Sequence, residues 1–278
     1  MSFLRSPAYR SGLLRLVRAL GLKEILWRLY KRWILSPDGS FGLTEGGVEA
    51  RFHARYRSEP QAIKECLQDE EDFLKALTTT LRPGDVVFDV GSHLGQFAIP
   101  LAKIVGDRGQ VIAFEPDPQA CERLRSHIVL NGLTNVRVFQ KGLGDANQSG
   151  KLFVEGHACP SLVPHEGESD RLSQTEAIEI VQGDWLVRNE ALPIPRAVKI
   201  DVEGYEYSVL RGLEQTLAHP SCELLCCEIH PEFLPQGITA EMVVKFVQSE
   251  GFSELVNHPC RGAQVHLIAS KRRLSTRI

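Results

Sequence analysis

The stretch Val86-Val87-Phe88-Asp89-Val90-Gly91-Ser92-His93-Leu94-Gly95 decides the fold of this chain. An apolar run leads into a turn that contains glycine, and a helix-like stretch follows. Such a turn lets the backbone approach a ligand closely and points helix N–H groups at it. About 20 residues further on, the apolar run Val111-Ile112-Ala113-Phe114 ends in Glu115, where an acid would meet the two hydroxyls of a ribose. The order strand, glycine turn, helix, strand, acid predicts a pocket for a nucleotide-type cofactor.

Strand-like and helix-like stretches alternate along most of the chain, which predicts a mostly parallel sheet with helices on both faces. The expected strands are 86–90, 111–115, 136–141, 197–202, 223–229, 253–257 and 264–270. The expected helices are 62–81, 96–105, 118–130, 205–217 and 242–250. Residues 151–171 are expected to form an extended loop with a short edge strand. We therefore expect a doubly wound α/β fold with a seven-stranded sheet and an N-terminal helical extension.

The first part of the chain has a different character, so we divide the chain into residues 1–60 and a main domain, residues 61–278. Residues 13–35 place leucines and aromatic residues at helical intervals among basic residues, which predicts amphipathic helices. Residues 36–60 are glycine-rich and polar, which indicates a loop and a small hairpin. Two interpretations of residues 1–35 stay open: helices packed on the domain, or a basic surface for anionic lipid or a protein partner.

Composition limits the partners and the compartment. The net charge of −3 over 278 residues gives the molecule no electrostatic reason to bind nucleic acid. The seven cysteines have no framework spacing and no signal peptide precedes them, so we expect reduced thiols in the cytoplasm. No run reaches the roughly 18 apolar residues of a membrane span, which leaves only peripheral membrane contact.

Polar side chains follow the ends of the predicted strands. In open α/β sheets, ligands bind beyond the carboxyl ends of the strands, so these side chains are the candidate site residues. They are Asp89, Glu115, residues 141–145, Asp201 with Glu203, and Glu228 with His230.

Together these residues resemble the class I S-adenosylmethionine-dependent methyltransferases and, among them, the FkbM family. The most specific segment is Val198-Lys199-Ile200-Asp201-Val202-Glu203-Gly204-Tyr205-Glu206, followed by Val209-Leu210-Arg211-Gly212. It matches the family pattern of Ile-Asp-Val-Glu-Gly, a second Glu and then Leu-x-Gly. Residues 83–91 and Glu228-Ile229-His230 also match, and the resemblance extends from about Glu70 to Ser270. One departure is His93, where the family commonly has Asn.

The resemblance implies a role for each matching residue near S-adenosylmethionine. Asp89 and Gly91 would lie beneath its amino-acid part, and Glu115 would accept hydrogen bonds from both ribose hydroxyls, as suits an acceptor-only carboxylate. Residues 142–145 would flank the adenine. The expected cofactor-binding residues are Asp89, Gly91, His93, Gly95, Glu115, Pro116, Gly142 and Asp145. Two alternatives stay open, a turn residue at Asp145 and a solvated strand-end acid at Glu115.

Methyl transfer is an in-line displacement at a sulfonium carbon, which needs an aligned nucleophile and gains from a base. Asp201, Glu203, Glu228 and His230 follow neighbouring strands and should converge at the rim where an acceptor enters. Our hypothesis is that His230 or Glu228 takes the hydroxyl proton while Asp201 and Glu203 orient the substrate. Alternatively, these carboxylates and the imidazole could hold a divalent cation such as magnesium.

A zinc site is not expected, although Cys222, Cys226, Cys227 and His230 lie close together in the sequence. Cys226 and Cys227 are neighbours in an apolar strand, so their side chains should point to opposite faces of the sheet. Zinc needs ligands that converge.

We therefore expect an S-adenosylmethionine-dependent O-methyltransferase, and the resemblance implies a hydroxyl acceptor on a sugar, glycan or secondary metabolite. A dinucleotide-dependent oxidoreductase is a second hypothesis, but the closely spaced Gly-x-Gly-x-x-Gly turn that holds a pyrophosphate is absent. A third is a non-catalytic scaffold that docks through its basic N-terminal helices.

Overall fold

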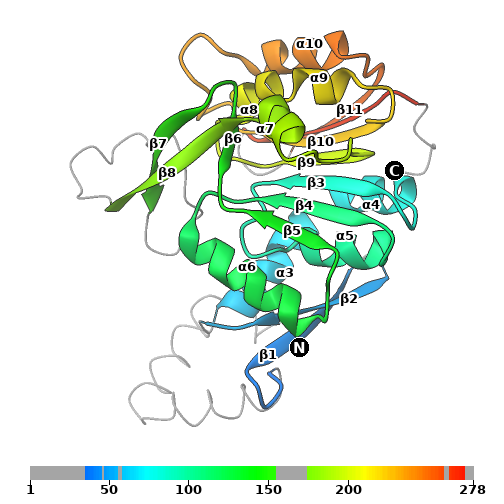
Figure 1. Ribbon diagram of the computed structural model, residues 1–278, viewed down its shortest axis with the longest axis vertical. Coiled ribbons are helices and arrows are strands. Elements are labelled where there is room, and N and C mark those ends of the chain that lie inside the picture. Colours follow the sequence, from blue (N-terminus) through cyan, green and yellow to red (C-terminus); the bar gives the residue numbers. More distant parts are fainter. Residues whose placement is uncertain (1–34, 46, 56–57, 155–173, 260–262, 273–278) are drawn as a thin grey trace, which may run out of the picture.

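A seven-stranded sheet forms the centre of the structure, a computed structural model that describes residues 35–45, 47–55, 58–154, 174–259 and 263–272 (Figure 1). The strand order is β11-β12-β10-β9-β3-β4-β5. The bounds are β3 (Val86–Val90), β4 (Gln110–Phe114), β5 (Val136–Phe139), β9 (Ala197–Ile200), β10 (Leu224–Ile229), β11 (Glu254–Pro259) and β12 (Val265–Ser270). Neighbours from β10 to β5 are parallel, and β12 is antiparallel to both β10 and β11. The predicted fold class is confirmed.

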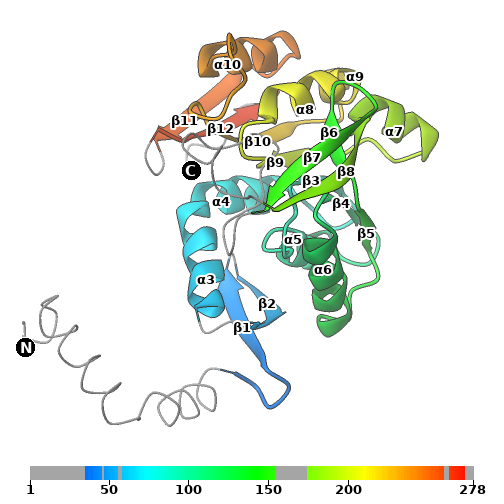
Figure 2. The same ribbon diagram turned by 90° about the vertical axis from the view of Figure 1, so that its left-hand side faces the viewer.

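Helices cover both faces of this sheet, as Figures 1 and 2 show. On one face lie α4 (Glu71–Thr80), α5 (Ala98–Val105) and α6 (Pro118–Leu130), and on the other α7 (Gly183–Asn189), α8 (Glu206–Gly212), α9 (Glu214–Ala218) and α10 (Ala240–Ser249). Alternate residues of each strand point to opposite faces and pack in two separate cores. Val87 packs in the core beneath α4, α5 and α6, and Phe88 packs in the core beneath α7, α8, α9 and α10. Both faces are buried, so the parallel strands are apolar almost throughout.

Two of the predicted helices are each divided in the structure. The expected helix 62–81 consists of α3 (Glu59–Asp69) and α4, separated at Glu70. The expected helix 205–217 consists of α8 and α9, separated at Leu213. Apolar periodicity continues across both breaks because the two halves bury side chains in the same core, so the pattern alone did not reveal them.

A hairpin of β1 (Ser40–Glu45) and β2 (Val48–His53) precedes the main sheet, within the segment where a small hairpin is expected. Phe52 of β2 is fully buried in the core that α5 also enters. The His53 main-chain N–H donates to Nε2 of His127 in α6 (3.1 Å). The division at residue 60 stays a prediction, and the helices expected in residues 13–35 lie outside the described residues.

A second, three-stranded sheet with the order β6-β8-β7 stands beside the main one. It contains β6 (Gly142–Gly144), β7 (Gln148–Val154) and β8 (Gln174–Gln182). One short edge strand was expected here, and strands β6 and β8 were not expected. Most of the loop expected at 151–171 lies outside the described residues. Nowhere in the described part of the chain is there a helix with the length and apolarity of a membrane span.

Candidate active site

A cavity of about 370 Å³ lies where β3, β4 and β9 end. Its size is within the range of small-molecule sites, roughly 300–1,000 Å³. The wall includes most of the predicted site residues: Asp89, Gly91, His93, Glu115, Pro116, Gly142, Asp201 and Glu203. Helix α3 adds further lining residues, among them Cys66. The carboxyl ends of the parallel strands thus converge on one pocket, as expected of this fold.

Four predicted site residues do not line this cavity as the structure describes it. Gly95 packs against α6, because a Cβ there would lie 2.6 Å from Leu124 Cδ1. Asp145 is exposed and follows directly after β6. Glu228 and His230 are buried behind the wall.

The glycine turn after β3 brings two backbones into contact. Gly91 has φ +80°, and a Cβ on it would lie 1.8 Å from the main-chain oxygen of Asp201. Only glycine fits both the left-handed φ and this close approach. His93 also has a positive φ, +45°, and its main-chain N–H donates to Glu115 Oε2 (2.7 Å). The turn therefore joins the ends of three strands at the cavity.

The Glu115 side chain lines the cavity and is held there by hydrogen bonds from the backbone. It is 6% exposed, and its Oε1 accepts a hydrogen bond from the main-chain N–H of Asp117 (2.9 Å). Burial raises the pKa of Glu115 to about 7. A carboxylate has about four acceptor positions, so one protein donor on each oxygen leaves room for two ligand hydroxyls.

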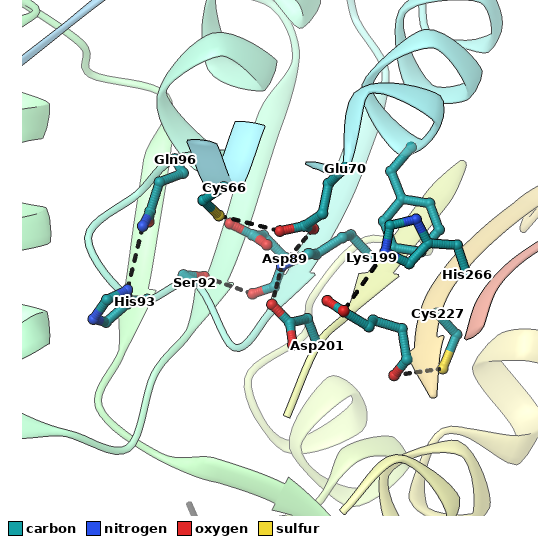
Figure 3. Close-up of polar contacts among 12 residues, drawn as sticks. Cys66, Glu70, Asp89, Ser92, His93, Gln96, Lys199, Asp201, Cys227 and His266 are labelled. Atoms are coloured by element: carbon teal, nitrogen blue, oxygen red, sulfur yellow. Dashed lines mark hydrogen bonds and ion pairs between the residues drawn. The ribbon is translucent and has the colours of Figure 1, made fainter. Parts of the chain in front are cut away.

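Three carboxylates surround the buried ammonium group of Lys199 at the floor of the cavity (Figure 3). Its Nζ lies 3.1 Å from Asp201 Oδ2 and 3.8 Å from Glu70 Oε2. Asp89 is the third, and neither of its carboxylate oxygens has a hydrogen-bond partner among the described residues. Burial raises the pKa of Asp89, opposed by the nearby charge of Lys199.

Glu70 and Lys199 were not among the predicted site residues. A signal for Lys199 existed, because it is a charged residue inside the otherwise apolar strand β9. A lysine at such a position is seldom buried without partners. Glu70 had no comparable signal, since it lies between two helices far from β9 in sequence.

A second group of charged side chains lies beside the Lys199 cluster. It consists of His230 and the three acids around it, Glu203, Glu206 and Glu228. Glu203 has φ +50°, and His230 Nε2 lies 3.4 Å from its Oε2. The same nitrogen lies 3.8 Å from Glu228 Oε1. On the other side of the ring, His230 Nδ1 lies 2.6 Å from Glu206 Oε1.

These contacts change the acidity of both side chains at the cavity wall. Burial raises the pKa of Glu203 to about 7, against the opposing charge of His230. Burial lowers the pKa of His230, but the hydrogen bond with Glu206 and the surrounding acids outweigh it and raise that pKa to about 9. Near neutral pH the imidazole is therefore cationic, and Glu203 titrates in the range where a general base is useful.

Among the residues that the structure describes, two sets of side chains come close enough to hold a metal ion: Asp201, Glu203 and His230, and Glu70, Asp201 and Glu228, each with its ligand atoms within 4.8 Å of one another. Each set already has a positive charge beside its carboxylates. The ammonium of Lys199 contacts Glu70 and Asp201 of the second set, and the imidazolium of His230 belongs to the first set. The divalent cation stays a prediction. Cys226 and Cys227 do face opposite sides of the sheet, as predicted.

Comparison with known proteins decides the family. A sequence profile described as the methyltransferase FkbM domain matches residues 89–254, more than half of the chain. The chain belongs to the FkbM methyltransferase family. The resemblance based on the motifs at Asp89, Asp201 and Glu228 is thus confirmed.

Individual relatives agree with this family. The hexuronic acid methyltransferase AglP of Haloferax volcanii is 30% identical over 69% of this chain and 75% of its own length. The 31-O-demethyl-FK506 methyltransferase FkbM of Streptomyces tacrolimicus is 26% identical over 69% of this chain and 82% of its own. Among solved structures, an rRNA methylase from Streptococcus thermophilus aligns with a TM-score of 0.46 and 14% identity, covering 74% of this chain and 97% of that one.

Proposed function

We propose that this FkbM-family methyltransferase uses S-adenosylmethionine to methylate a hydroxyl of a sugar, glycan or secondary metabolite. The observation that carries the proposal is Glu115, a buried carboxylate in the wall of a cavity at the strand ends. The names of two relatives support the acceptor class. One acts on a hexuronic acid and the other on 31-O-demethyl-FK506.

The residues present suit S-adenosylmethionine, which offers a ribose diol, an adenine, a sulfonium and an amino acid. Glu115 would accept from the diol, and Gly142 would lie at the adenine. The unbonded oxygens of Asp89 would meet the ammonium of the amino acid. Asp201 and Glu203 add negative charge, which suits a cationic ligand.

The same charges disfavour the dinucleotide hypothesis. A pyrophosphate at the turn after β3 would face the carboxylates of Asp89 and Asp201 in a buried setting, where repulsion between like charges is weakly screened. The scaffold hypothesis leaves this concentration of buried acids around a cavity unexplained.

Bound S-adenosylmethionine supplies an electrophilic methyl group on a sulfonium. The protein then needs to align an acceptor oxygen with that methyl and to receive its proton. Glu203 lines the cavity and has a pKa of about 7, so we assign it the proton. Asp201, held by Lys199, would orient the acceptor. Glu203 lines the cavity and His230 and Glu228 do not, which favours Glu203 as the proton acceptor over the two residues to which the sequence pattern assigned the proton.

A labelling experiment tests this proposal. The full chain is incubated with S-adenosylmethionine carrying a labelled methyl group and a panel of methyl glycosides of hexoses and hexuronic acids, with and without EDTA. We expect label in a methyl ether on one or more sugars. Alkali-labile label would indicate a carboxyl ester instead, and loss of label with EDTA would support the divalent cation.

A thermal-shift measurement separates the cofactor hypotheses. We expect S-adenosylhomocysteine to raise the melting temperature and NAD to leave it unchanged, since a ligand that binds only the native state stabilises it. Stabilisation by NAD alone would overturn the proposal.

A further inference from the structure

Glu206, the first residue of α8, makes two hydrogen bonds with a single oxygen. Its Oε1 accepts from the main-chain N–H of Gly204 (2.8 Å) and lies 2.6 Å from His230 Nδ1. Because an ionised carboxylate can only accept, Nδ1 of His230 carries the proton of this bond. Glu206 and His230 are 0% and 2% exposed. One buried oxygen therefore fixes both the backbone that follows Glu203 and the imidazole that faces it.

The backbone at Glu203 and Gly204 adopts a conformation that its surroundings must stabilise. Glu203 has φ +50° and Gly204 has φ +98°. A non-glycine residue in the left-handed region costs of order 1–3 kcal/mol and persists only where its surroundings enforce it. A Cβ on Gly204 would lie 2.5 Å from the main-chain oxygen of Phe233, so the loop is also confined from that side.

The imidazole of His230 connects Glu206 to Glu203, which lines the cavity. With Nδ1 bound to Glu206, the opposite nitrogen Nε2 is directed at Glu203 Oε2, 3.4 Å away. Glu228 approaches the same nitrogen less closely, at 3.8 Å. A buried carboxylate that accepts from one ring nitrogen of a histidine commonly holds the ring in one orientation and so fixes the partner of the other nitrogen.

We propose that Glu206 is a positioning residue for methyl transfer, which acts through His230 to hold the Glu203 carboxylate at the cavity wall. The inference rests on the proposed function, because it assumes that Glu203 receives the acceptor proton. Among the described residues that line the cavity, neither Glu206 nor His230 is present, so the role of Glu206 does not require contact with substrate.

Substitution of Glu206 by glutamine on the full chain tests the proposal. The amide keeps the size of the side chain but removes its negative charge, so the imidazolium of His230 loses an ion pair and keeps only a weaker hydrogen bond to a neutral oxygen. We expect kcat to fall by about 10- to 100-fold, part of the roughly 10²–10⁴-fold that a positioned base contributes. The KM for S-adenosylmethionine should change by less than about 3-fold, because the cofactor residues are untouched.

A double-mutant cycle with His230→Asn separates positioning from an independent role. If Glu206 acts through His230, E206Q should have no further effect on kcat in the H230N background. Additive losses in kcat would overturn the proposal, as would an E206Q variant with unchanged kcat. Asp184→Asn is the matched control: Asp184 is also buried and accepts from Gln215 and Thr216, but it lies in α7 away from the cavity. That variant should lose stability and keep its kcat.

NMR on histidine labelled with ¹⁵N gives a readout that needs no acceptor. We expect a proton on Nδ1 of His230 that exchanges slowly with water in the wild type and in D184N, that exchanges faster in E206Q and that is absent from H230N. An Nδ1 proton unchanged in E206Q would overturn the inference. Failure of the wild type to bind S-adenosylhomocysteine would instead refute the proposed function, and the imidazole signal would still show whether Glu206 holds the ring.

Discussion

Glu203 is the residue whose charge state matters most to the proposed chemistry. It must be ionised to receive a proton, and burial raises its pKa to about 7. The wild-type rate should therefore rise with pH through about 7 and level off above it. Glu203→Gln should lower kcat by about 100-fold or more while S-adenosylhomocysteine still binds.

The measurement is a pH profile of kcat with the acceptor identified by labelling. A rate that is flat from pH 6 to pH 8 would contradict the assignment of Glu203, and so would full activity of the glutamine variant.

Individual residues also show how far the sequence could predict this site. Glu115 and Asp201 could be placed because strand ends in this fold meet at one edge, so position in the chain predicted position in space. Glu70 could not be placed, since it reaches Lys199 from the junction of α3 and α4 and no periodic pattern links the two. His230 was placed correctly after β10, but only packing determines that Glu203 stands between it and the cavity.

At the level of elements, the turn after β3 contacts the residue that follows β9, and both segments line the cavity. The contact is between the backbones of Gly91 and Asp201. Gly91→Ala should destabilise the protein by more than about 1 kcal/mol, because the new Cβ combines an unfavourable φ with a contact 1.8 Å from Asp201 O. It should also weaken the binding of S-adenosylhomocysteine.

Gly132→Ala is the control for φ alone. Gly132 has φ +64°, and its added Cβ would meet no described atom within 4 Å. Denaturant unfolding of the two variants should therefore show the larger loss in G91A. Equal losses would mean that the close approach of the two backbones has no energetic weight.

Elements of the main sheet were predictable because their apolar runs and helical intervals are strong local signals. The break at Leu213 was not, since residues on both sides of it pack into one core. Strand β8 alternates polar and apolar residues, with Ile178 and Ile180 packed toward Leu152. That period-two signal was available and was missed.

For the whole molecule, the buried acids and histidines determine how stability depends on pH. The pKa values of Glu70, Glu115 and Glu203 rise to about 8, 7 and 7, from about 4.3 in an unfolded chain. Burial is the main cause in each case. Above pH 4.3 the native state therefore binds more protons than the unfolded state, and stability is lost as pH rises toward 8.

Two histidines act in the same direction at higher pH. Against the effect of burial, partners raise the pKa of His230 to about 9 and that of His266 to about 10. The stability that they add is present below about pH 6.5 and is lost as pH rises through those values. Burial lowers the pKa values of His93 and His127, so these two side chains add stability as pH rises through about 6.5. Above that range the melting temperature should fall steadily, from pH 7 to pH 9. A melting temperature that rises over this interval would show that these groups are not buried as described.

Calorimetric titration of the wild type and of Glu115→Gln with S-adenosylhomocysteine tests whether Glu115 binds the ribose of the cofactor. We predict that the wild type binds and that the variant binds about 10- to 100-fold more weakly, because it loses charge-assisted bonds to the ribose hydroxyls. Glu122→Gln, an exposed acid on α6, should bind like the wild type. Equal affinity of the Glu115 variant and the wild type would show that Glu115 does not hold the ribose, and no binding by the wild type would show that the cavity is not a site for this cofactor.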